Sequence, residues 1–582
     1  MKISNYKKPM VFLAFVCLLP FNCTDSVLDV NPQGVVTDAD LNSPENVEKL
    51  VIAAYAAQAN DFWQAPFQDM WPWGSVGGGD AYKGGGGIGD QLWIHWLEVK
   101  ALNAPVGNPG NEVTYKYIYA AIGRINEALE RLNALTDEQL PTRRQRIAEM
   151  NFLRANTYFK LKVLFKHIVY IDETIPKEKY VEISNRELTD QEGWNWIINE
   201  FRKAVAVLPD TQEDAGRPTK SAAQLFLAKT LVYKAYVQND SHEVVSITAS
   251  ELNEAISLFE TVDAAGIYEL WPDYSYNFEC AHEGGPESVW AIMRSLNDGT
   301  ADGRINYGNS LNSPVSAGYG CCGFFQPSTN LANAFKTDAN GHPLVTNYNE
   351  APIINSNVDV EANNMDPRIS HTVGLLGMPW KYDPAIIVNA TFPRVPAQYG
   401  TNMGMKDQEL PTNSCWRQSA AFYGSGRNTD VMRYADALLY WAEALVETTP
   451  SRFQEALPII NRIRERASNS TSRLVKGDGS PSGKYVIGLY APSDFATQEQ
   501  ARQAVRFERR LEMAMESFPG RHFDLVRWGI AEQTLNEYYA VEKNRRSYLV
   551  EGHYTQSRDE YQPIPQIEIT ISQGVLIQNP GY

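Results

Sequence analysis

The stretch DVMRYADALLYWAEAL, residues 430–445, decides the fold class of this chain. Its apolar side chains recur every three or four residues, which places them on one face of an α-helix. That face carries Tyr434, Leu438, Ala442 and Leu445. A second stretch with the same period, ALPIINRIRERA (456–467), follows after a short break. Two amphipathic helices joined by so few residues are expected to pack against each other as a pair.

The same paired pattern runs through most of the chain. Ser43 and Pro44 supply an N-cap and a proline for the first turn of one helix, and Thr189 with Glu192 forms a capping box before another. The predicted helices cover 45–60, 114–135, 143–167, 190–208, 221–236, 431–447, 452–468, 499–518 and a segment after Arg521. We therefore predict a mainly α protein with a tetratricopeptide-like, superhelical scaffold of paired helices.

Two long regions lack this helical period. Residues 60–112 are rich in glycine, tryptophan and aspartate, and residues 263–428 are rich in asparagine, glycine, proline and aromatic side chains. Loops of such length inside a folded protein usually carry function. We expect these two regions to form an irregular binding face on a helical scaffold built from 43–59, 114–262 and 430–582.

The N-terminus has the features of an export signal. Three lysines among the first nine residues precede an apolar run from Met10 to Phe21, which is too short to span a bilayer. Cys23 follows directly, where bacterial lipoproteins carry their lipidated first residue. We predict a signal peptide at 1–22, lipidation at Cys23 and one mature unit at 23–582. The alternative is ordinary cleavage, with Cys23 incidental.

Composition excludes several classes of function. The formal net charge of −17 argues against nucleic-acid binding and against general attraction to anionic lipid. Four cysteines after Cys23 are too few for a disulfide scaffold, and the CC doublet at 321–322 lacks zinc-binding spacing. The GGGGIG stretch at 84–89 follows no apolar strand, so it does not indicate a dinucleotide site. We expect no metal, no cofactor and no enzymatic activity.

Segments along the whole mature chain resemble one known family. RFERRLEMAMESFPGRHFDLVRWG (506–529) and YQPIPQIEITISQGVLIQNPGY (561–582) follow the helix pair described above. Earlier segments agree in order: LDVNPQG (28–34), GDAYKGG (79–85), NFLRANTYFKL (151–161), GRPTKSAAQLFLAK (216–229), FFQPSTNLANAF (324–335) and MDPRI (365–369). Together they resemble the SusD/RagB family of outer-membrane nutrient-binding lipoproteins.

This resemblance implies a place and a partner. A family member is anchored in the outer membrane by its lipid, faces the cell exterior and covers a SusC-like TonB-dependent transporter. It captures a glycan there and delivers it to the transporter. Two alternatives remain open: a RagB-like lid that binds peptides, and a structural lid with no ligand affinity of its own. The charged residues of these motifs are expected to form helix-surface and inter-helix ion pairs and not to contact the ligand; they are Arg506, Glu508, Arg509, Arg510, Glu512 and Glu516.

Aromatic side chains of the two loop regions are the candidate ligand contacts. A sugar ring has apolar C–H faces that stack on flat aromatics, and hydroxyl groups that bind polar side chains. Trp194, Trp290 and Trp441 lie in periodic or strand-like stretches and are expected in the core. The ligand-binding residues that we predict are Trp71, Trp73, Trp93, Tyr307, Tyr319, Trp63, Tyr82 and Trp96, with Asp80 as the hydroxyl partner.

Overall fold

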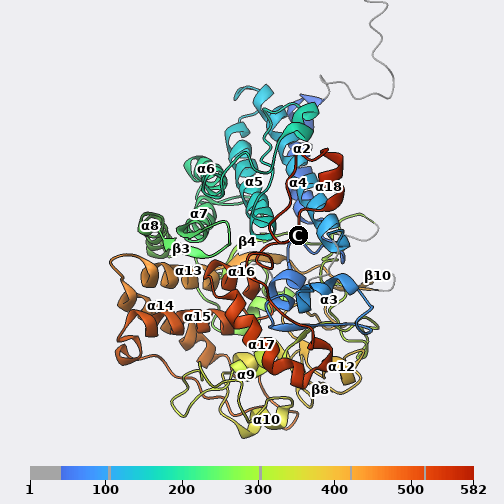
Figure 1. Cartoon of the computed structure of the whole chain (residues 1–582), viewed down its shortest axis with the longest axis vertical. Coiled ribbons are helices and arrows are strands. Elements are labelled where there is room, and N and C mark those ends of the chain that lie inside the picture. Colours follow the sequence, from blue (N-terminus) through green and yellow to red (C-terminus); the bar gives the residue numbers. More distant parts are fainter. Residues whose placement is uncertain (1–40, 102–105, 301–303, 420–421, 517–519) are drawn as a thin grey trace, which may run out of the picture.

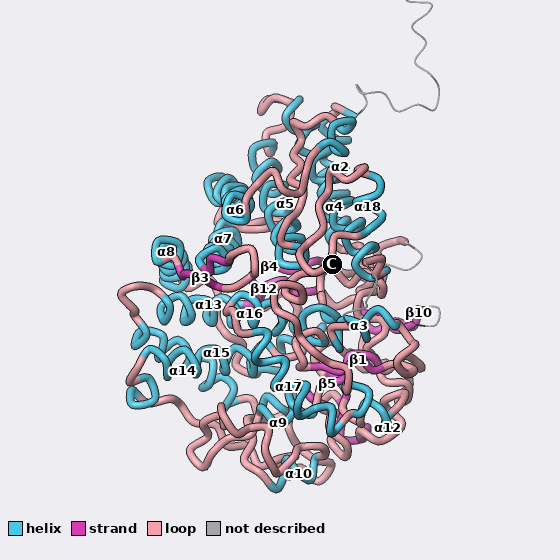
Figure 2. Tube along the Cα trace, viewed as in Figure 1, coloured by secondary structure: helices cyan, strands magenta, loops and turns pink. Residues whose placement is uncertain are grey.

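The computed structural model of the protein describes residues 41–101, 106–300, 304–419, 422–516 and 520–582. Helices fill the upper part and the left side of Figure 1, and loops dominate its lower part. Figure 2 shows the same division, with cyan helices above and mostly pink loops below. The predicted mainly α class is confirmed. The predicted signal peptide and Cys23 lie outside the described residues.

A continuous series of packed helices forms the scaffold. Each helix contacts the next in the order α2, α4, α5, α6, α7, α8, α13, α14 and α15. Their bounds are α2 Pro44–Gln58, α4 Pro109–Ala134, α5 Arg143–Phe165, α6 Asp190–Val207, α7 Lys220–Ala235, α8 Ala249–Ala265, α13 Tyr434–Glu447, α14 Phe453–Asn469 and α15 Gln498–Met513. Helices α16 (Gly520–Arg527), α17 (Ala531–Arg545) and α18 (Gln566–Ile571) complete the C-terminal part.

The ends of these helices follow their capping residues. The Ser43 hydroxyl accepts a hydrogen bond from the amide of Asn46, and Thr189 and Glu192 form the predicted capping box. Helix α4 begins five residues before its predicted start because the side chain of Asn108 caps it. Helix α5 ends at Phe165, where Lys166 adopts a positive φ of 56°.

The segments between the scaffold helices contain short elements. The described residues form six two-stranded antiparallel ladders, which pair β1 (Ala81–Gly84) with β5 (Phe324–Pro327), β2 (Tyr236–Gln238) with β3 (Val244–Ile247), β4 (Ser288–Ile292) with β12 (Thr429–Arg433), β6 (Val373–Gly374) with β9 (Met403–Gly404), β7 (Pro379–Trp380) with β8 (Asp383–Ile387), and β10 (Trp416–Ser419) with β11 (Phe422–Ser425). Short helices are α3 (Leu92–Val99), α9 (Thr329–Ala334), α10 (Asn357–Ala362), α11 (Arg368–Thr372) and α12 (Pro396–Tyr399). The expectation that 60–112 contains no helix was wrong, because α3 lies within it.

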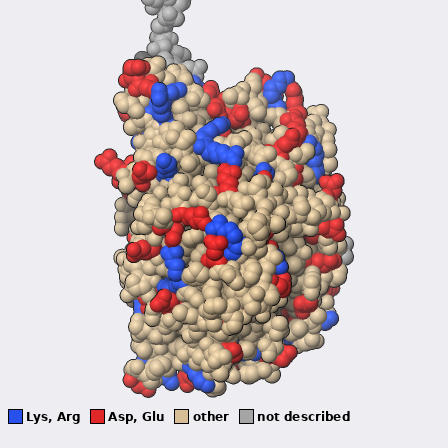
Figure 3. Space-filling view, turned by 90° about the vertical axis from the view of Figure 1, so that its left-hand side faces the viewer, with Lys and Arg blue, Asp and Glu red and all other residues tan. Residues whose placement is uncertain are grey.

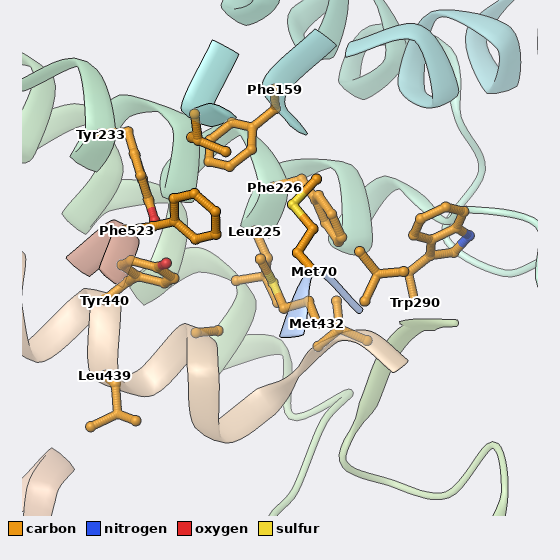
Figure 4. Close-up of a cluster of buried hydrophobic side chains, with 14 of the residues drawn as sticks. Met70, Phe159, Leu225, Phe226, Tyr233, Trp290, Met432, Leu439, Tyr440 and Phe523 are labelled. Atoms are coloured by element: carbon orange, nitrogen blue, oxygen red, sulfur yellow. The ribbon is translucent and has the colours of Figure 1, made fainter. Parts of the chain in front are cut away.

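The largest apolar core joins the scaffold to both loop regions. Figure 4 shows Phe159 of α5 and Phe226 of α7 beside Met70, Trp290 and other apolar side chains. Trp290, which was expected in the core, is 3% exposed and packs edge-on against Phe226. This shared core fixes the start of each loop region relative to the helices.

Most of the charged motif residues lie inside the protein, although the side chains of Arg506 and Glu516 are 19% and 12% exposed. Other acidic and basic side chains lie interspersed on the surface drawn in Figure 3. Glu512 of α15 forms ion pairs with Arg368, Arg433 and Arg466, and all four side chains are at most 3% exposed. Although burial alone would raise the pKa of Glu512, Arg466 and Arg433 hold it well below its usual value. The prediction of inter-helix ion pairs is therefore confirmed, but the surface location that we expected for them was wrong.

Candidate functional site

Three of the predicted tryptophans point into the core. Trp71, Trp73 and Trp93 are 1%, 1% and 3% exposed. The indole N–H of Trp71 donates to the carbonyl oxygen of Gly308 at 3.1 Å, and that of Trp73 donates to the side chain of Asn111 at 2.9 Å. The rings of Trp73 and Trp93 pack 5.5 Å apart. These rings present no face to solvent, which corrects the expectation that they stack on a ligand.

Two predicted tyrosines are also buried. Tyr82 donates its hydroxyl hydrogen to the carboxylate of Glu542 at 2.5 Å, and Tyr319 donates to the carbonyl oxygen of Glu409 at 2.6 Å. Burial raises the pKa of both phenols. Each hydroxyl therefore links its loop segment to another part of the protein interior. This burial corrects the expectation that the two rings stack on a ligand.

Asp80 has charged partners instead of an open position. Arg510 donates to its carboxylate at 2.8 Å, and Arg521 donates to the same oxygen at 3.1 Å. The position of Asp80 follows from close backbone packing, because a Cβ at Gly78 would lie 2.7 Å from the amide nitrogen of His522. Asp80, which we expected to bind the hydroxyl groups of a ligand, is thus part of an ion cluster beside α15 and α16.

Trp63, Trp96 and Tyr307 are the predicted aromatics that stay partly exposed. Trp96 lines a small hollow together with the C-terminal residue Tyr582. Trp63 and Tyr307 lie on two segments that touch, since a Cβ at Gly308 would lie 3.3 Å from the Cβ of Asp61. The structure thus brings the segments of Trp63 and Tyr307 together across the two loop regions.

Three buried contacts hold these two segments in place. The guanidinium of Arg294 donates to Asp61 at 2.9 Å, and the side-chain amide of Asn306 donates to Asp69 at 3.1 Å. The hydrogen bond from Trp71 to Gly308 is the third. Sequence reasoning missed the positioning roles of Asp61, Asp69 and Asn306, because their partners lie more than 200 residues away.

A polar hollow lies beside Asn306, where the two loop regions meet β12. Its volume is about 60 Å³. Side chains that can donate or accept hydrogen bonds line it, among them Asp69, Asn277, Asn306, Asn309, Asp407, Arg427 and Asn428. The hollow is too small for a whole sugar ring. The hydroxyl groups along one edge of a sugar ring can form hydrogen bonds in this hollow. Its side-chain amides can donate and accept, its carboxylates can accept, and its guanidinium can donate.

Two acidic groups of this hollow bind protons more tightly than usual. Burial raises the pKa of Asp407 to about 6, against hydrogen bonds from Asn312 and Gln408 that favour the ionised form. Burial also raises the pKa of Asp430 to about 6. Near neutral pH these carboxyl groups can therefore serve as acceptors, and in mild acid also as donors.

The cysteines of this region are paired. Cys280 and Cys415 form a disulfide that closes a separation of 135 residues, and the neighbouring Cys321 and Cys322 form another. Among the described residues, one group of three side chains has the spacing of metal ligands, namely Cys280, Glu409 and Cys415. Because its two sulfurs are bonded to each other, this group does not offer the thiolates that a metal ion would require.

Comparison with known proteins identifies the family to which this helical scaffold and its two loop regions belong. The profile described as "SusD family" matches residues 286–582, and the profile described as "Starch-binding associating with outer membrane" matches residues 91–232. The chain belongs to the SusD family. The prediction that it is not an enzyme agrees with this family of binding proteins.

Similar proteins cover almost the whole chain. SusD-like protein P2 of Formosa agariphila is 22% identical, over 99% of this chain and all of that protein. A SusD-like protein from Bacteroides fragilis has a similar structure, with a TM-score of 0.68, 19% identity and coverage of 94% of this chain and 99% of that one. Surface glycan-binding protein A from Bacteroides thetaiotaomicron, solved with laminarihexaose, has a TM-score of 0.64 at 20% identity, over 92% of this chain and 99% of that one. These likenesses establish the fold.

The second profile connects this chain with the outer membrane. A search of the described helices finds none with the length and apolar character needed to cross a bilayer.

Proposed function

We propose that this protein binds a glycan at the cell surface and passes it to a SusC-like TonB-dependent transporter, while a lipid on Cys23 anchors it to the outer membrane. The observation that carries the proposal is the match to the SusD family over residues 286–582, together with structural neighbours whose printed names report glycan binding. The laminarihexaose complex supports an oligosaccharide as the ligand.

Contacts in the loop regions support a site at the junction of the Trp63 and Tyr307 segments. Both rings are partly exposed, so each can offer a face to a sugar ring. The polar hollow supplies hydrogen-bonding groups beside the Tyr307 segment, because Asn306 and Asn309 line it. Trp71 and Asp69 then act indirectly, because they hold the Tyr307 segment from inside.

Isothermal titration calorimetry of the chain without residues 1–22 tests this site, with laminarihexaose and maltohexaose as probes. We expect Trp63→Ala and Tyr307→Ala each to lose about 2 kcal/mol of binding free energy, which is about 30-fold in affinity. Tyr180→Ala is the matched control, because Tyr180 is a half-buried tyrosine on a short scaffold helix at Lys177–Glu182. Unchanged affinity in both loop variants, with circular dichroism like that of the parent, would contradict the site.

The proposed delivery step requires a partner protein that has a transport pathway. We propose that this partner is a TonB-dependent barrel. Purification in mild detergent should recover a TonB-dependent barrel with this protein, and repeated recovery of the protein alone would count against delivery. Protease treatment of intact cells should degrade the parent protein. Cys23→Ala should release the protein from the membrane fraction.

Two alternatives have distinct outcomes in the same experiments. A peptide-binding lid would bind a peptide mixture and neither glucan. A structural lid would bind neither class of ligand and would still purify with the barrel.

A further inference from the structure

A second cavity adjoins the polar hollow, because Met513 and Met515 line both. Helices α15, α16 and α17, which adjoin one another near the centre of Figure 1, surround it together with the loop that carries Tyr348. Its volume is about 400 Å³, within the range of sites for small ligands. We call it the arginine cavity, after Arg510 and Arg521 in its lining.

The arginine cavity has more positive than negative charge at its floor. Arg510 and Arg521 share the single carboxylate of Asp80, at 2.8 and 3.1 Å. Their side chains are 7% and 10% exposed, and that of Asp80 is 3% exposed. Among the described residues, two guanidinium groups on one carboxylate leave one positive charge without a balancing acidic partner at this spot.

The ionisation of a neighbouring tyrosine agrees with this excess. Burial would raise the pKa of Tyr348, but Arg510 and Arg521 lower it below its usual value. The pKa of Arg521 is itself lowered, first by burial and then by Arg510. A positive potential therefore remains after Asp80 has made its contacts.

Most other charged groups around the arginine cavity are paired. On α15, Arg502 and Arg506 pair with Glu447, and Arg502 also pairs with Glu499. Arg509 pairs with Asp436 and Asp524. Glu537 of α17 has no ion pair among the described residues, and it is exposed to solvent. Solvent screens the charge of Glu537 more strongly than the charges of buried Arg510 and Arg521, so positive charge dominates at the floor of the cavity.

Aromatic side chains form the walls above this charge. Phe507 of α15 and Trp528, which follows α16, line the arginine cavity together with Tyr348. The guanidinium of Arg510 lies 5.2 Å from the centre of the Tyr348 ring. Aromatic walls suit the apolar faces of a sugar ring, and a guanidinium fork suits a planar carboxylate or a sulfate.

We infer that the arginine cavity binds an acidic saccharide, with its carboxylate or sulfate group against Arg510 and Arg521 and its ring between the aromatic walls. The saccharide part of this inference rests on the proposed function, and the acidic part rests on the charge at the floor. Neither Trp63 nor Tyr307 lines the arginine cavity, so it forms a second binding site beside the one proposed above.

The test is calorimetry of the chain without residues 1–22, with trigalacturonate as the probe and neutral maltotriose as the matched control. We expect trigalacturonate to bind, with affinity at least tenfold weaker at 300 mM than at 50 mM NaCl. Arg521→Gln should weaken binding at least tenfold. Thr534→Trp should abolish it by filling the cavity from α17 without removing a buried ion pair, so it decides the matter if Arg521→Gln fails to fold.

Each outcome separates this inference from the proposed function. Equal binding of trigalacturonate to the parent and to folded Thr534→Trp would overturn the inference, as would equal affinity for maltotriose. Inorganic sulfate that binds as tightly as trigalacturonate would exclude the saccharide part. Binding of laminarihexaose without binding of trigalacturonate would refute the arginine cavity alone. Failure of every saccharide would instead refute the proposed function.

Discussion

Replacement of Trp71 separates a core tryptophan from a ligand platform. The side chain is 1% exposed, and its indole N–H donates to the carbonyl oxygen of Gly308. Truncation of a buried tryptophan to alanine costs about 3–5 kcal/mol of stability. The unpaired carbonyl oxygen adds about 1 kcal/mol. We therefore expect Trp71→Ala to lower the free energy of unfolding by about 4–6 kcal/mol.

Trp71→Phe is the matched variant, because it keeps most of the ring and removes the indole N–H. It should cost about 1 kcal/mol of stability from the lost hydrogen bond, plus a smaller packing loss. Guanidinium unfolding of the chain without residues 1–22, followed by far-UV circular dichroism, measures both changes. Calorimetry with laminarihexaose measures binding on the same samples.

Replacement of Trp71 should affect mainly the stability of the protein, and replacement of Trp63 should affect mainly glycan binding. Trp63→Ala, at a partly exposed ring on the same segment, should affect binding more than stability. The reasoning would be refuted if the free energy of unfolding of Trp71→Ala lay within 1 kcal/mol of the parent value while the variant bound no glycan. That result would mean that the Trp71 ring contacts the ligand directly.

Three further outcomes follow from buried charges and the disulfide. Asp407→Asn should become more stable relative to the parent as the pH rises from 4 to 7, by at most about 1.4 kcal/mol per pH unit, in pH-dependent guanidinium unfolding. The sign follows because the folded pKa of Asp407 lies above its unfolded value, so its stabilising contribution is complete below about pH 4 and is lost as the pH rises through about 6. Glu512→Gln should cost about 3–5 kcal/mol because it leaves buried arginines without their partner, while Lys49→Met at an exposed helix pair should leave the unfolding midpoint unchanged. Cys415→Ser should cost about 2–4 kcal/mol and leave the Cys280 thiol free for alkylation, as mass spectrometry would detect; an unchanged midpoint would contradict a disulfide at this position.

Periodic stretches predicted most of the scaffold helices because each of these carries its own signal, but α8 was not predicted. The apolar face of 430–445 and the capping box at Thr189 are local patterns, and both appear in the structure. Helix α3 was missed because LWIHWLEV is short and apolar throughout, which leaves no period to detect. Helix pairs could thus be predicted well, and short helices inside loops could not.

Burial in the loop regions depends on partners far away in the sequence. Trp71 bonds to a residue 237 positions later, and Tyr82 bonds to one 460 positions later. Asp80 and Arg510 are 430 positions apart. No local pattern distinguishes these side chains from exposed loop residues such as those on a binding surface. The candidate site could therefore be assigned to its two regions from the sequence, but its individual residues could not.

Helices α8 and α13 contact each other directly, although the second loop region lies between them in the chain. During synthesis, α8 therefore emerges long before α13, the helix that covers it. Until α13 is made, the apolar side chains of α8 that face it stay exposed, and exposed apolar surface favours aggregation. We expect changes that slow the folding of residues 266–433 to lower the yield of folded protein, even where the final structure is unaltered.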